Sequence, residues 1–241
     1  LPPLQFSYAL PYGAVLHDKG VQFVVYSRSA TAMRVLLYNS VDDQEPAEVI
    51  ALDPAKDRWG DIWSILVPGV GPGQLYHFQA DGPFDPERGQ RFDGQARLVD
   101  PYARALAGEF TLGADGLLRP PKCVVIDDSF DWQGDRHLRR GLADTVIYEL
   151  HVRGFTASPT SGVAEPGTYL GLIEKIPYLQ SLGVTAVELM PIHEFASAMP
   201  SAAGTGQSNY WGYDPLAFFS PHRGYAAGSE PDVHKKREGI K

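Results

Sequence analysis

A strand, a helix and a second strand succeed one another within residues 144–191, and this order constrains the fold more than any other feature of the sequence. Residues 144–156 are rich in β-branched and aromatic side chains, which favours a strand. Residues 168–182 have apolar side chains at helical spacing and lead through Gly183 into an apolar run, 184–191. Such a unit joins parallel strands by a right-handed crossover, so the sequence predicts the start of a parallel sheet covered by helices.

The first predicted strand has two different faces, because side chains alternate along a strand. One face carries Val146, Tyr148, Leu150 and Val152, and the other carries Ile147, Glu149, His151 and Arg153. We expect the first face to contact a core. We expect the charged groups to form a structural network of ion pairs and hydrogen bonds rather than an acid–base set, since buried charges need partners.

The helical pattern carries its own start, break and stop signals. Thr168 is the expected N-cap, because its side chain can accept a hydrogen bond from the first turn. Pro177 lacks a backbone N–H, so we expect a break near Ile176 and a second short helix that begins with the proline. Gly183 is the expected C-terminal stop.

The N-terminal part of the chain has the pattern of an antiparallel sandwich of roughly a hundred residues. Its expected strands are residues 21–27, 34–38, 62–67 and 75–80, separated by turn-forming residues. Its aromatic residues include Tyr38, Trp59, Trp63, Tyr76 and Phe78. Core packing is the usual fate of such rings in a small sandwich, and a sugar-stacking platform is the alternative.

Residues 82–140 are rich in Gly, Pro, Asp and Arg, with one short apolar run at 123–126. This composition indicates a long, partly ordered connection between two domains. Residues 100–104 within it form a predicted turn, because Pro101 fixes φ and Asp100 can bond the backbone that follows.

Composition excludes several classes of partner and cofactor. The net charge is −8 and the signs are scattered, which argues against nucleic acid or an anionic membrane as a partner. Cys123 is the single cysteine, so the sequence predicts no internal disulfide, no cysteine zinc site and a reducing, cytoplasmic location. We expect no metal and no cofactor, and no apolar run reaches the length of about 18 residues that indicates a membrane helix.

The densest aromatic cluster of the sequence follows the second predicted strand. Residues 209–215 read Asn-Tyr-Trp-Gly-Tyr-Asp-Pro. Loops at the carboxyl ends of parallel strands carry the chemistry of α/β barrels. Trp211 and Tyr213 can therefore stack on a flat sugar face while Asp214 bonds hydroxyl groups, or the rings can simply cover the mouth of a barrel.

Several of these segments resemble a known family when they are taken together and in order. Residues 145–156, 178–192 and 209–215 are similar to the opening of the catalytic barrel of the α-amylase superfamily, glycoside hydrolase family 13. Upstream, the segments that resemble the glycan-binding sandwich and connector of isoamylase-type glycogen debranching enzymes are residues 12–14, 21–27, 76–83 and 98–103.

This resemblance implies a multidomain β plus α/β fold. Residues 1–105 would form an immunoglobulin-like β-sandwich that binds carbohydrate, residues 106–143 a connector, and residues 144–241 the incomplete start of a (β/α)₈ barrel. The implied activity of the full-length enzyme is hydrolysis of α-1,6 linkages in branched α-glucans such as glycogen, limit dextrin or amylopectin, by a retaining mechanism.

The resemblance also assigns roles to residues of the aromatic cluster. Tyr213 matches the tyrosine that stacks on the sugar at the cleavage subsite, with Trp211 and Asp214 as its neighbours. The family uses a nucleophilic Asp, a Glu acid and a second Asp, and two carboxylates about 5 Å apart suit retention.

None of these three catalytic carboxylates has a match in this sequence. The family's third-strand motif, an Asp followed four and five residues later by Asn and His, is absent, and the tail 229–241 lacks the apolar periodicity of a further helix. We therefore expect a truncated or diverged end and no hydrolysis by this chain alone.

Two other functions remain open at this point. A branching transglycosylase or a trehalose-releasing hydrolase would share the sandwich and the barrel opening. A glucan-binding protein without catalysis would share the binding surface alone.

Overall fold

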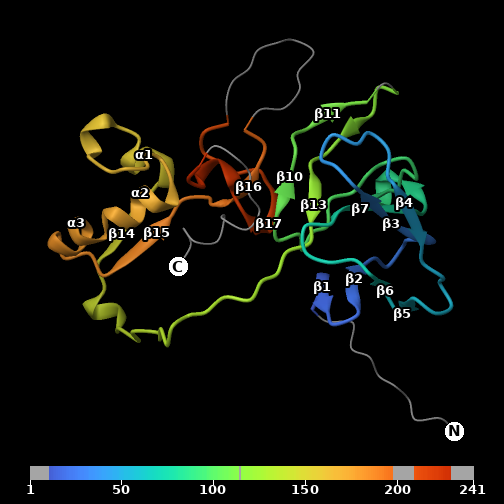
Figure 1. The fold of residues 1–241 in the computed structure, drawn as a ribbon, viewed down its shortest axis with the longest axis horizontal. Coiled ribbons are helices and arrows are strands. Elements are labelled where there is room, and N and C mark those ends of the chain that lie inside the picture. The colour runs from blue at the N-terminus through green and yellow to red at the C-terminus, as the bar shows by residue number, and fades with distance from the viewer. Residues whose placement is uncertain (1–10, 114, 198–208, 229–241) are drawn as a thin grey trace, which may run out of the picture. The chain divides into compact units, whose positions relative to one another are not determined.

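The computed structural model describes residues 11–113, 115–197 and 209–228, which form two compact units (Figure 1). The described part of the first unit consists of residues 11–113, 115–127 and 216–220. The second consists of residues 128–197, 209–215 and 221–228. Each unit is considered by itself.

The first unit is built from two antiparallel sheets. One sheet has the strand order β1 (Gly13–His17), β2 (Gly20–Tyr26), β6 (Ile62–Pro68) and β5 (Arg58–Trp59). The other has the order β10 (Leu106–Ala107), β13 (Lys122–Val124), β7 (Leu75–Asp81), β3 (Ala32–Tyr38) and β4 (Glu48–Ala51). The four strands expected from periodicity correspond to β2, β3, β6 and β7.

Alternation of side chains along these strands produces one core between the sheets. The cluster takes Val21, Phe23 and Val25 from β2 and Val35 and Leu37 from β3, and it also contains Trp63, Tyr76 and Phe78. Of the five aromatic residues considered above, Tyr38, Trp63, Tyr76 and Phe78 are at most 2% exposed, whereas Trp59 is 59% exposed. Core packing therefore holds for four of them.

The first unit also contains several short elements. Two small hairpins pair β8 (Phe84–Asp85) with β9 (Gln90–Arg91) and β11 (Thr111–Leu112) with β12 (Leu118–Arg119), and a 3₁₀ turn spans Pro86–Arg88. Strands β10, β11, β12 and β13 lie within the segment 106–143 that the sequence assigns to a connector, so its first part has secondary structure of its own. The domain boundaries stay a prediction.

The turn expected at Asp100 is present and is tied to the core. The backbone N–H of Ala103 donates to the Asp100 carbonyl (3.0 Å) and that of Tyr102 to Asp100 Oδ1 (2.8 Å). The Tyr76 hydroxyl donates to Asp100 Oδ2 (2.7 Å), and the Asp100 N–H donates to Cys123 Sγ (3.2 Å). The Asp100 side chain is fully buried, and burial raises its pKa to about 6.

His77, which follows Tyr76 in β7, makes a second set of buried hydrogen bonds. Its Nε2 lies 3.0 Å from the Pro121 carbonyl oxygen, which can only accept, so Nε2 carries the proton and Nδ1 accepts from the Tyr38 hydroxyl at 3.2 Å. Burial lowers the pKa of His77 to about 4, so the ring stays neutral. Because side chains alternate, Tyr76 and His77 fasten segments to opposite faces of β7.

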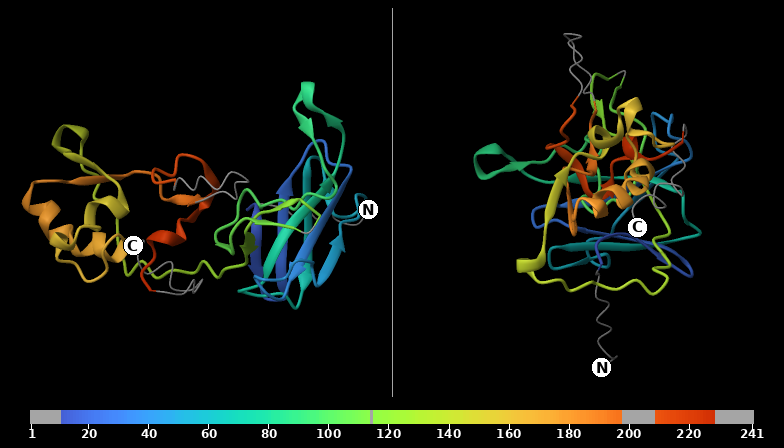
Figure 2. Two further views of the ribbon diagram at one scale, coloured as in Figure 1. Left: turned by 90° about the horizontal axis from the view of Figure 1, so that it is seen from above. Right: turned by 90° about the vertical axis from the view of Figure 1, so that its left-hand side faces the viewer.

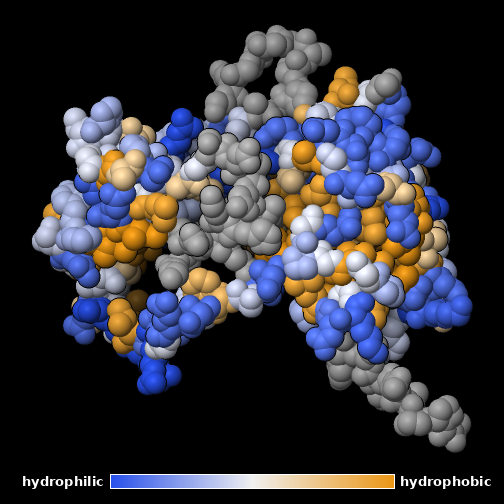
Figure 3. Space-filling view, in the orientation of Figure 1, coloured by the Kyte–Doolittle hydropathy of each residue, from blue (hydrophilic) through white to orange (hydrophobic). Residues whose placement is uncertain are grey.

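The second unit contains the expected strand–helix–strand unit. Strands β14 (Ile147–Leu150) and β15 (Ala186–Leu189) pair in parallel, with Ile147 opposite Ala186 and Leu150 opposite Leu189. Helices α2 (Tyr169–Glu174) and α3 (Ile176–Ser181) lie in the connection between them (Figure 2). Ile147 and Val187 of the pair are exposed, as is Val146 just before β14, and apolar surface is visible on this unit in Figure 3.

The helix signals are confirmed. The Thr168 side chain accepts from the Gly171 N–H at 3.1 Å and caps α2. The helix breaks at Lys175, and Pro177 stands in the first turn of α3. Gly183 follows with a φ of +79°, a left-handed conformation in which glycine carries no steric penalty.

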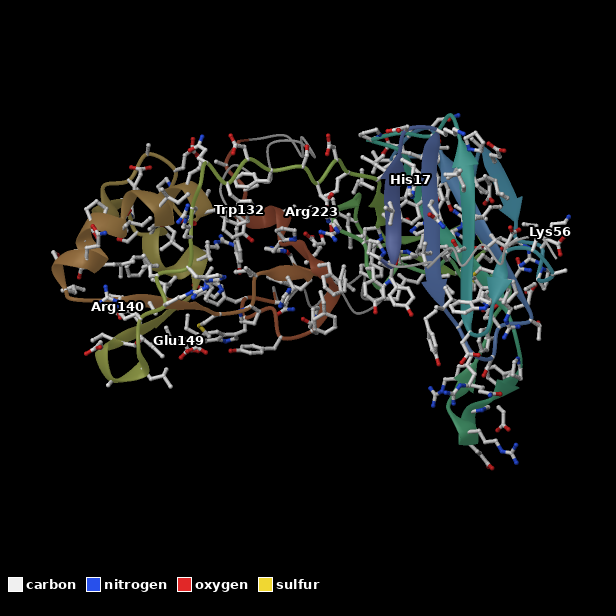
Figure 4. All side chains as sticks on the ribbon, turned by 90° about the horizontal axis from the view of Figure 1, so that it is seen from below. His17, Lys56, Trp132, Arg140, Glu149 and Arg223 are labelled. Atoms are coloured by element: carbon white, nitrogen blue, oxygen red, sulfur yellow. The ribbon has the colours of Figure 1, made fainter. Side chains whose placement is uncertain are left out.

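The prediction of one strand over residues 144–156 is wrong at both ends, because Leu142–Asp144 is a 3₁₀ turn and β14 begins only at Ile147. Strand β14 stops at Leu150, and α1 (Val152–Thr156) begins after His151, whose Nδ1 accepts from the Gly154 N–H at 3.0 Å. This capping bond outweighs the strand propensity of the segment. The expected two-face pattern is also not found within β14: Ile147, Tyr148 and Glu149 (labelled in Figure 4) are all exposed, and only Leu150 is buried. His151, which follows the strand, is buried.

The remaining elements complete the described chain. They are the 3₁₀ turns Leu142–Asp144, Pro159–Ser161 and Arg223–Tyr225 and the strands β16 (His193–Phe195) and β17 (Pro215–Pro221). Residues 216–220 of β17 belong to the first unit, where Ala217 joins the core and Phe219 stacks on Tyr102 (5.2 Å between centroids). No helix in the described ranges is long and apolar enough to cross a membrane.

We expect Asp100→Asn to remove a pH dependence of stability. The pKa of Asp100 is 3.8 in ordinary surroundings and about 6 when buried here, so between these values the folded chain holds a proton that the unfolded chain has released. This group therefore makes the free energy of unfolding fall as the pH rises through that window, by about 3 kcal/mol in all. Urea unfolding between pH 4 and 7 measures it, and parallel curves for the two proteins would contradict the assignment.

Candidate functional site

The three predicted site residues lie together on one loop of the second unit. Trp211 is 54% exposed and Tyr213 is 67% exposed. Together with Met190, Asn209 and Asp214 they line an open depression with a volume of about 650 Å³. Met190 comes directly after β15, so the depression adjoins the carboxyl end of a parallel strand. Residues 198–208, which precede this segment in the sequence, lie outside the described residues.

Asn209 organises the polar side of the loop. Its amide group donates to the Asp214 carboxylate, and its Oδ1 accepts from the Gly212 N–H at 3.1 Å. Its own backbone N–H donates to the Ser197 carbonyl at 3.0 Å. One side chain thus closes the loop across five residues and orients the carboxylate beside the two exposed rings.

Gly212 is required by both backbone and packing. Its φ of +73° is in the left-handed region, where a side chain is strained. A Cβ at this position would lie 2.5 Å from Cε1 of Phe195. The loop can therefore approach the Phe195 ring only because residue 212 has no side chain.

Phe195 is supported by His222 and by the buried carboxylate of Glu194. The Phe195 ring stacks on His222, with 3.8 Å between centroids and 13° between planes. Glu194, 1% exposed, places Oε1 3.7 Å from His222 Nδ1 and 3.2 Å from Arg223 Nε, and its Oε2 accepts from the Arg223 N–H at 2.8 Å. Arg223 is labelled in Figure 4. These contacts hold residues 194–195 against the 3₁₀ turn Arg223–Tyr225.

On the other side of the loop, the Tyr210 ring stacks on His151, with 4.3 Å between centroids. Tyr225 lies against the same histidine, its hydroxyl 3.2 Å from His151 Nε2. Burial raises the pKa of Tyr225 to about 12, so this hydroxyl keeps its proton at neutral pH. The phenol therefore serves as a hydrogen-bonding group rather than as an acid or a base.

The arrangement has the chemistry of a binding surface. Two exposed rings offer flat apolar faces, and the adjacent Asp214 carboxylate accepts hydrogen bonds from hydroxyl groups. Among the residues that line the depression, Asp214 is the only one with a carboxylate, so these residues do not supply the pair of acids that glycoside hydrolysis needs. In the described ranges, no group of three or more His, Cys, Asp or Glu side chains is arranged to hold a metal ion.

Sequence reasoning named Trp211, Tyr213 and Asp214 but gave no role to Asn209, Met190 or Phe195. An Asn three residues before a Gly, as in Asn209 and Gly212, is a signal for a side-chain-closed turn and was available in the sequence. The contact of Phe195 with Gly212 depends on tertiary packing and carries no such local signal.

Comparison with known proteins confirms the resemblance inferred from the sequence. Residues 11–103 match the family described as carbohydrate-binding module 48 (isoamylase N-terminal domain). Chloroplastic isoamylase 1 of Arabidopsis thaliana is 38% identical over 231 residues, which cover 91% of this chain and 30% of that protein. A glycogen debranching enzyme of Yersinia pseudotuberculosis is 40% identical over 248 residues, which cover 96% of this chain and 36% of that protein.

Solved structures of pullulanases also match this chain. A mutant of the pullulanase of Paenibacillus barengoltzii, in complex with maltotetraose, matches with a TM-score of 0.70 and 26% identity over 90% of this chain and 33% of that one. The present chain thus spans about a third of the length of the relatives that it matches.

We expect Gly212→Ala to destabilise the second unit by about 2 kcal/mol, because it combines left-handed strain with a clash against Phe195. Gly162→Ala is the matched control: its φ is +68°, but no atom lies within 4 Å of the added Cβ. That variant should lose only the backbone term, about 1 kcal/mol. Chemical denaturation compares the two, and equal losses would show that the Phe195 contact is unimportant.

Proposed function

We propose that this chain is the N-terminal part of an α-glucan debranching glycoside hydrolase that cleaves α-1,6 linkages in glycogen, limit dextrin or amylopectin with retention. In this proposal the first unit is an immunoglobulin-like carbohydrate-binding module. The strand–helix–strand unit opens a (β/α)₈ barrel, and Trp211, Tyr213 and Asp214 bind the glucan.

The observation that carries the proposal is the exposed pair of rings beside a held carboxylate. Large aromatic side chains are normally buried, yet Trp211 and Tyr213 are more than half exposed on a loop whose backbone is fixed by Asn209, Gly212 and Phe195. A rigid, exposed aromatic surface with a hydrogen-bond acceptor suits a ligand with flat apolar faces and a rim of hydroxyl groups. A glucose unit has this character.

The relatives support a glucan as the ligand. Their names are isoamylase and glycogen debranching enzyme, and the pullulanase structure was solved with maltotetraose. The names of these relatives favour debranching over the branching and trehalose-releasing reactions that share the same domains.

The parallel pair β14 and β15 supports the barrel assignment. Parallel strands joined through helices are the repeating unit of the (β/α)₈ fold, whose active sites lie at the carboxyl ends of the strands. Met190 and the aromatic loop are at this end of the pair. The residues of this chain would bind and orient the sugar at the cleavage subsite, with Tyr213 stacked on its face, while proton transfer and nucleophilic attack need carboxylates on later strands.

We also propose a reducing, cytoplasmic location. The single cysteine, Cys123, is buried in the sandwich core, and burial raises the pKa of its thiol. A buried neutral thiol packs as a small apolar group and takes no part in disulfide exchange.

We expect Tyr213→Ala and Trp211→Ala each to weaken the binding of maltotetraose about tenfold, because a lost stacking contact of this kind is worth about 1 kcal/mol or more. Tyr178→Ala is the matched control, since Tyr178 is a 51% exposed ring on α3 that does not line the depression. NMR titration measures the three affinities. If binding is the same in all variants, the aromatic loop is not the glucan site.

We expect the 241-residue chain to release no maltooligosaccharides from glycogen, because the residues that match the family's motifs include none of its catalytic carboxylates. Chromatography of the soluble products after prolonged incubation tests this. Release of linear maltooligosaccharides by the purified chain would contradict it.

A further inference from the structure

His151 contacts the aromatic loop from the end of β14, although 59 residues separate it from Tyr210 in the sequence. Its ring is 8% exposed and lies almost parallel to the Tyr210 ring, at 4.3 Å between centroids and 6° between planes. His151 Nε2 is 2.9 Å from the Tyr210 carbonyl oxygen. One side chain therefore contacts both the ring and the backbone of Tyr210.

The hydrogen bonds of His151 define its tautomer. The Gly154 N–H can only donate, so Nδ1, 3.0 Å away, bears the lone pair. The Tyr210 carbonyl can only accept, so Nε2 bears the proton. The oxygen of the Tyr225 hydroxyl, 3.2 Å from Nε2, must then accept as well. The ring is a neutral imidazole, protonated at Nε2, with both nitrogens bonded.

The Tyr210 side chain is also confined by Gly154 of helix α1. A Cβ at Gly154 would lie 2.6 Å from the Tyr210 hydroxyl oxygen, so the tyrosine occupies space that only a glycine leaves free. Trp211 meets this pair edge-on, with its ring 5.6 Å and 86° from Tyr210 and 6.1 Å and 85° from His151. The orientation of the exposed tryptophan is thus set against the stacked pair.

We infer that His151 is a positioning residue for the glucan-binding surface: it fixes Tyr210, and through Tyr210 the exposed rings of Trp211 and Tyr213. This inference rests on the proposed function of those rings. His151 itself is buried beneath the loop and does not line the depression.

The capping role of His151 and its positioning role use different atoms, so a substitution can separate them. Capping of α1 needs only the acceptor at Nδ1. Positioning needs the ring face and the donor at Nε2. Asparagine is a strong N-cap whose side-chain oxygen can replace Nδ1, but it has no ring and does not reach the Tyr210 carbonyl. His151→Asn therefore retains the cap and removes the support of the loop.

Titration of the purified chain with maltotetraose, followed by NMR, tests the inference. For His151→Asn we expect an affinity about tenfold lower, loss of the nuclear Overhauser contacts between the Trp211 and Tyr210 rings, and a capped Gly154 amide that stays protected from hydrogen exchange. The control is Thr168→Ala, which removes the cap of α2 and should alter neither the affinity nor the contacts between these rings. Wild-type affinity and retained contacts between the Trp211 and Tyr210 rings in His151→Asn would overturn the inference.

A double-mutant cycle distinguishes positioning from general destabilisation. If His151 acts through Tyr210, Tyr210→Ala should weaken binding by a similar factor, and the double variant should bind no more weakly than either single variant. Additive losses would overturn the inference. If Trp211→Ala and Tyr213→Ala leave the affinity unchanged, the proposed function fails, and the contacts between the Trp211 and Tyr210 rings in His151→Asn still report whether His151 positions the loop.

Discussion

The parallel pairing of β14 with β15 is the constraint on which the candidate site depends. Parallel strands end at the same edge of a sheet, so the residues that follow them become neighbours. The Met190 N–H donates to the Leu150 carbonyl at 2.9 Å and extends the pairing to the last residue of β14. His151 follows that residue and supports the loop 209–214, while Met190 lines the depression. An antiparallel pair would have carried these residues to opposite edges.

The sandwich unit relies on buried polar groups that act in opposite directions as the pH changes. Between pH 3.8 and about 6, Asp100 is protonated in the folded chain and ionised in the unfolded chain. Between pH 6.5 and about 4, His77 is neutral in the folded chain and protonated in the unfolded chain. The first term lowers stability as the pH rises and the second lowers it as the pH falls. Both side chains are hydrogen-bonded. Asp100 accepts from the Tyr102 N–H and from the hydroxyl of Tyr76 on β7, and His77 on β7 bonds the Pro121 carbonyl.

Local patterns in the sequence predicted the long elements and missed the contacts between them. Periodicity located β2, β3, β6 and β7, and Thr168, Pro177 and Gly183 marked the two helices, because each signal lies within a few residues. Strands of two or three residues, such as β5, β10 and β13, are too short to show a period. The strand propensity of the segment placed His151 on a strand face. The structure differs because the hydrogen bond between the Gly154 N–H and His151 caps a helix instead. The stacking of His151 on Tyr210 joins distant segments, so no local pattern contains it.

Gly154 of α1 and Gly212 of the aromatic loop separate the positions of the candidate site that tolerate variation from those that do not. A Cβ at Gly154 would lie 2.6 Å from the Tyr210 hydroxyl oxygen and one at Gly212 would lie 2.5 Å from the Phe195 ring, so neither fits unless that side chain moves. Trp211, Tyr213 and Asp214 instead line an open depression. A combinatorial library randomised at 211, 213 and 214 with both glycines held constant would sample new ligand preferences on an unchanged main chain. Directed evolution of carbohydrate selectivity would find its productive substitutions at positions 211, 213 and 214 and its destabilising ones at the two glycines.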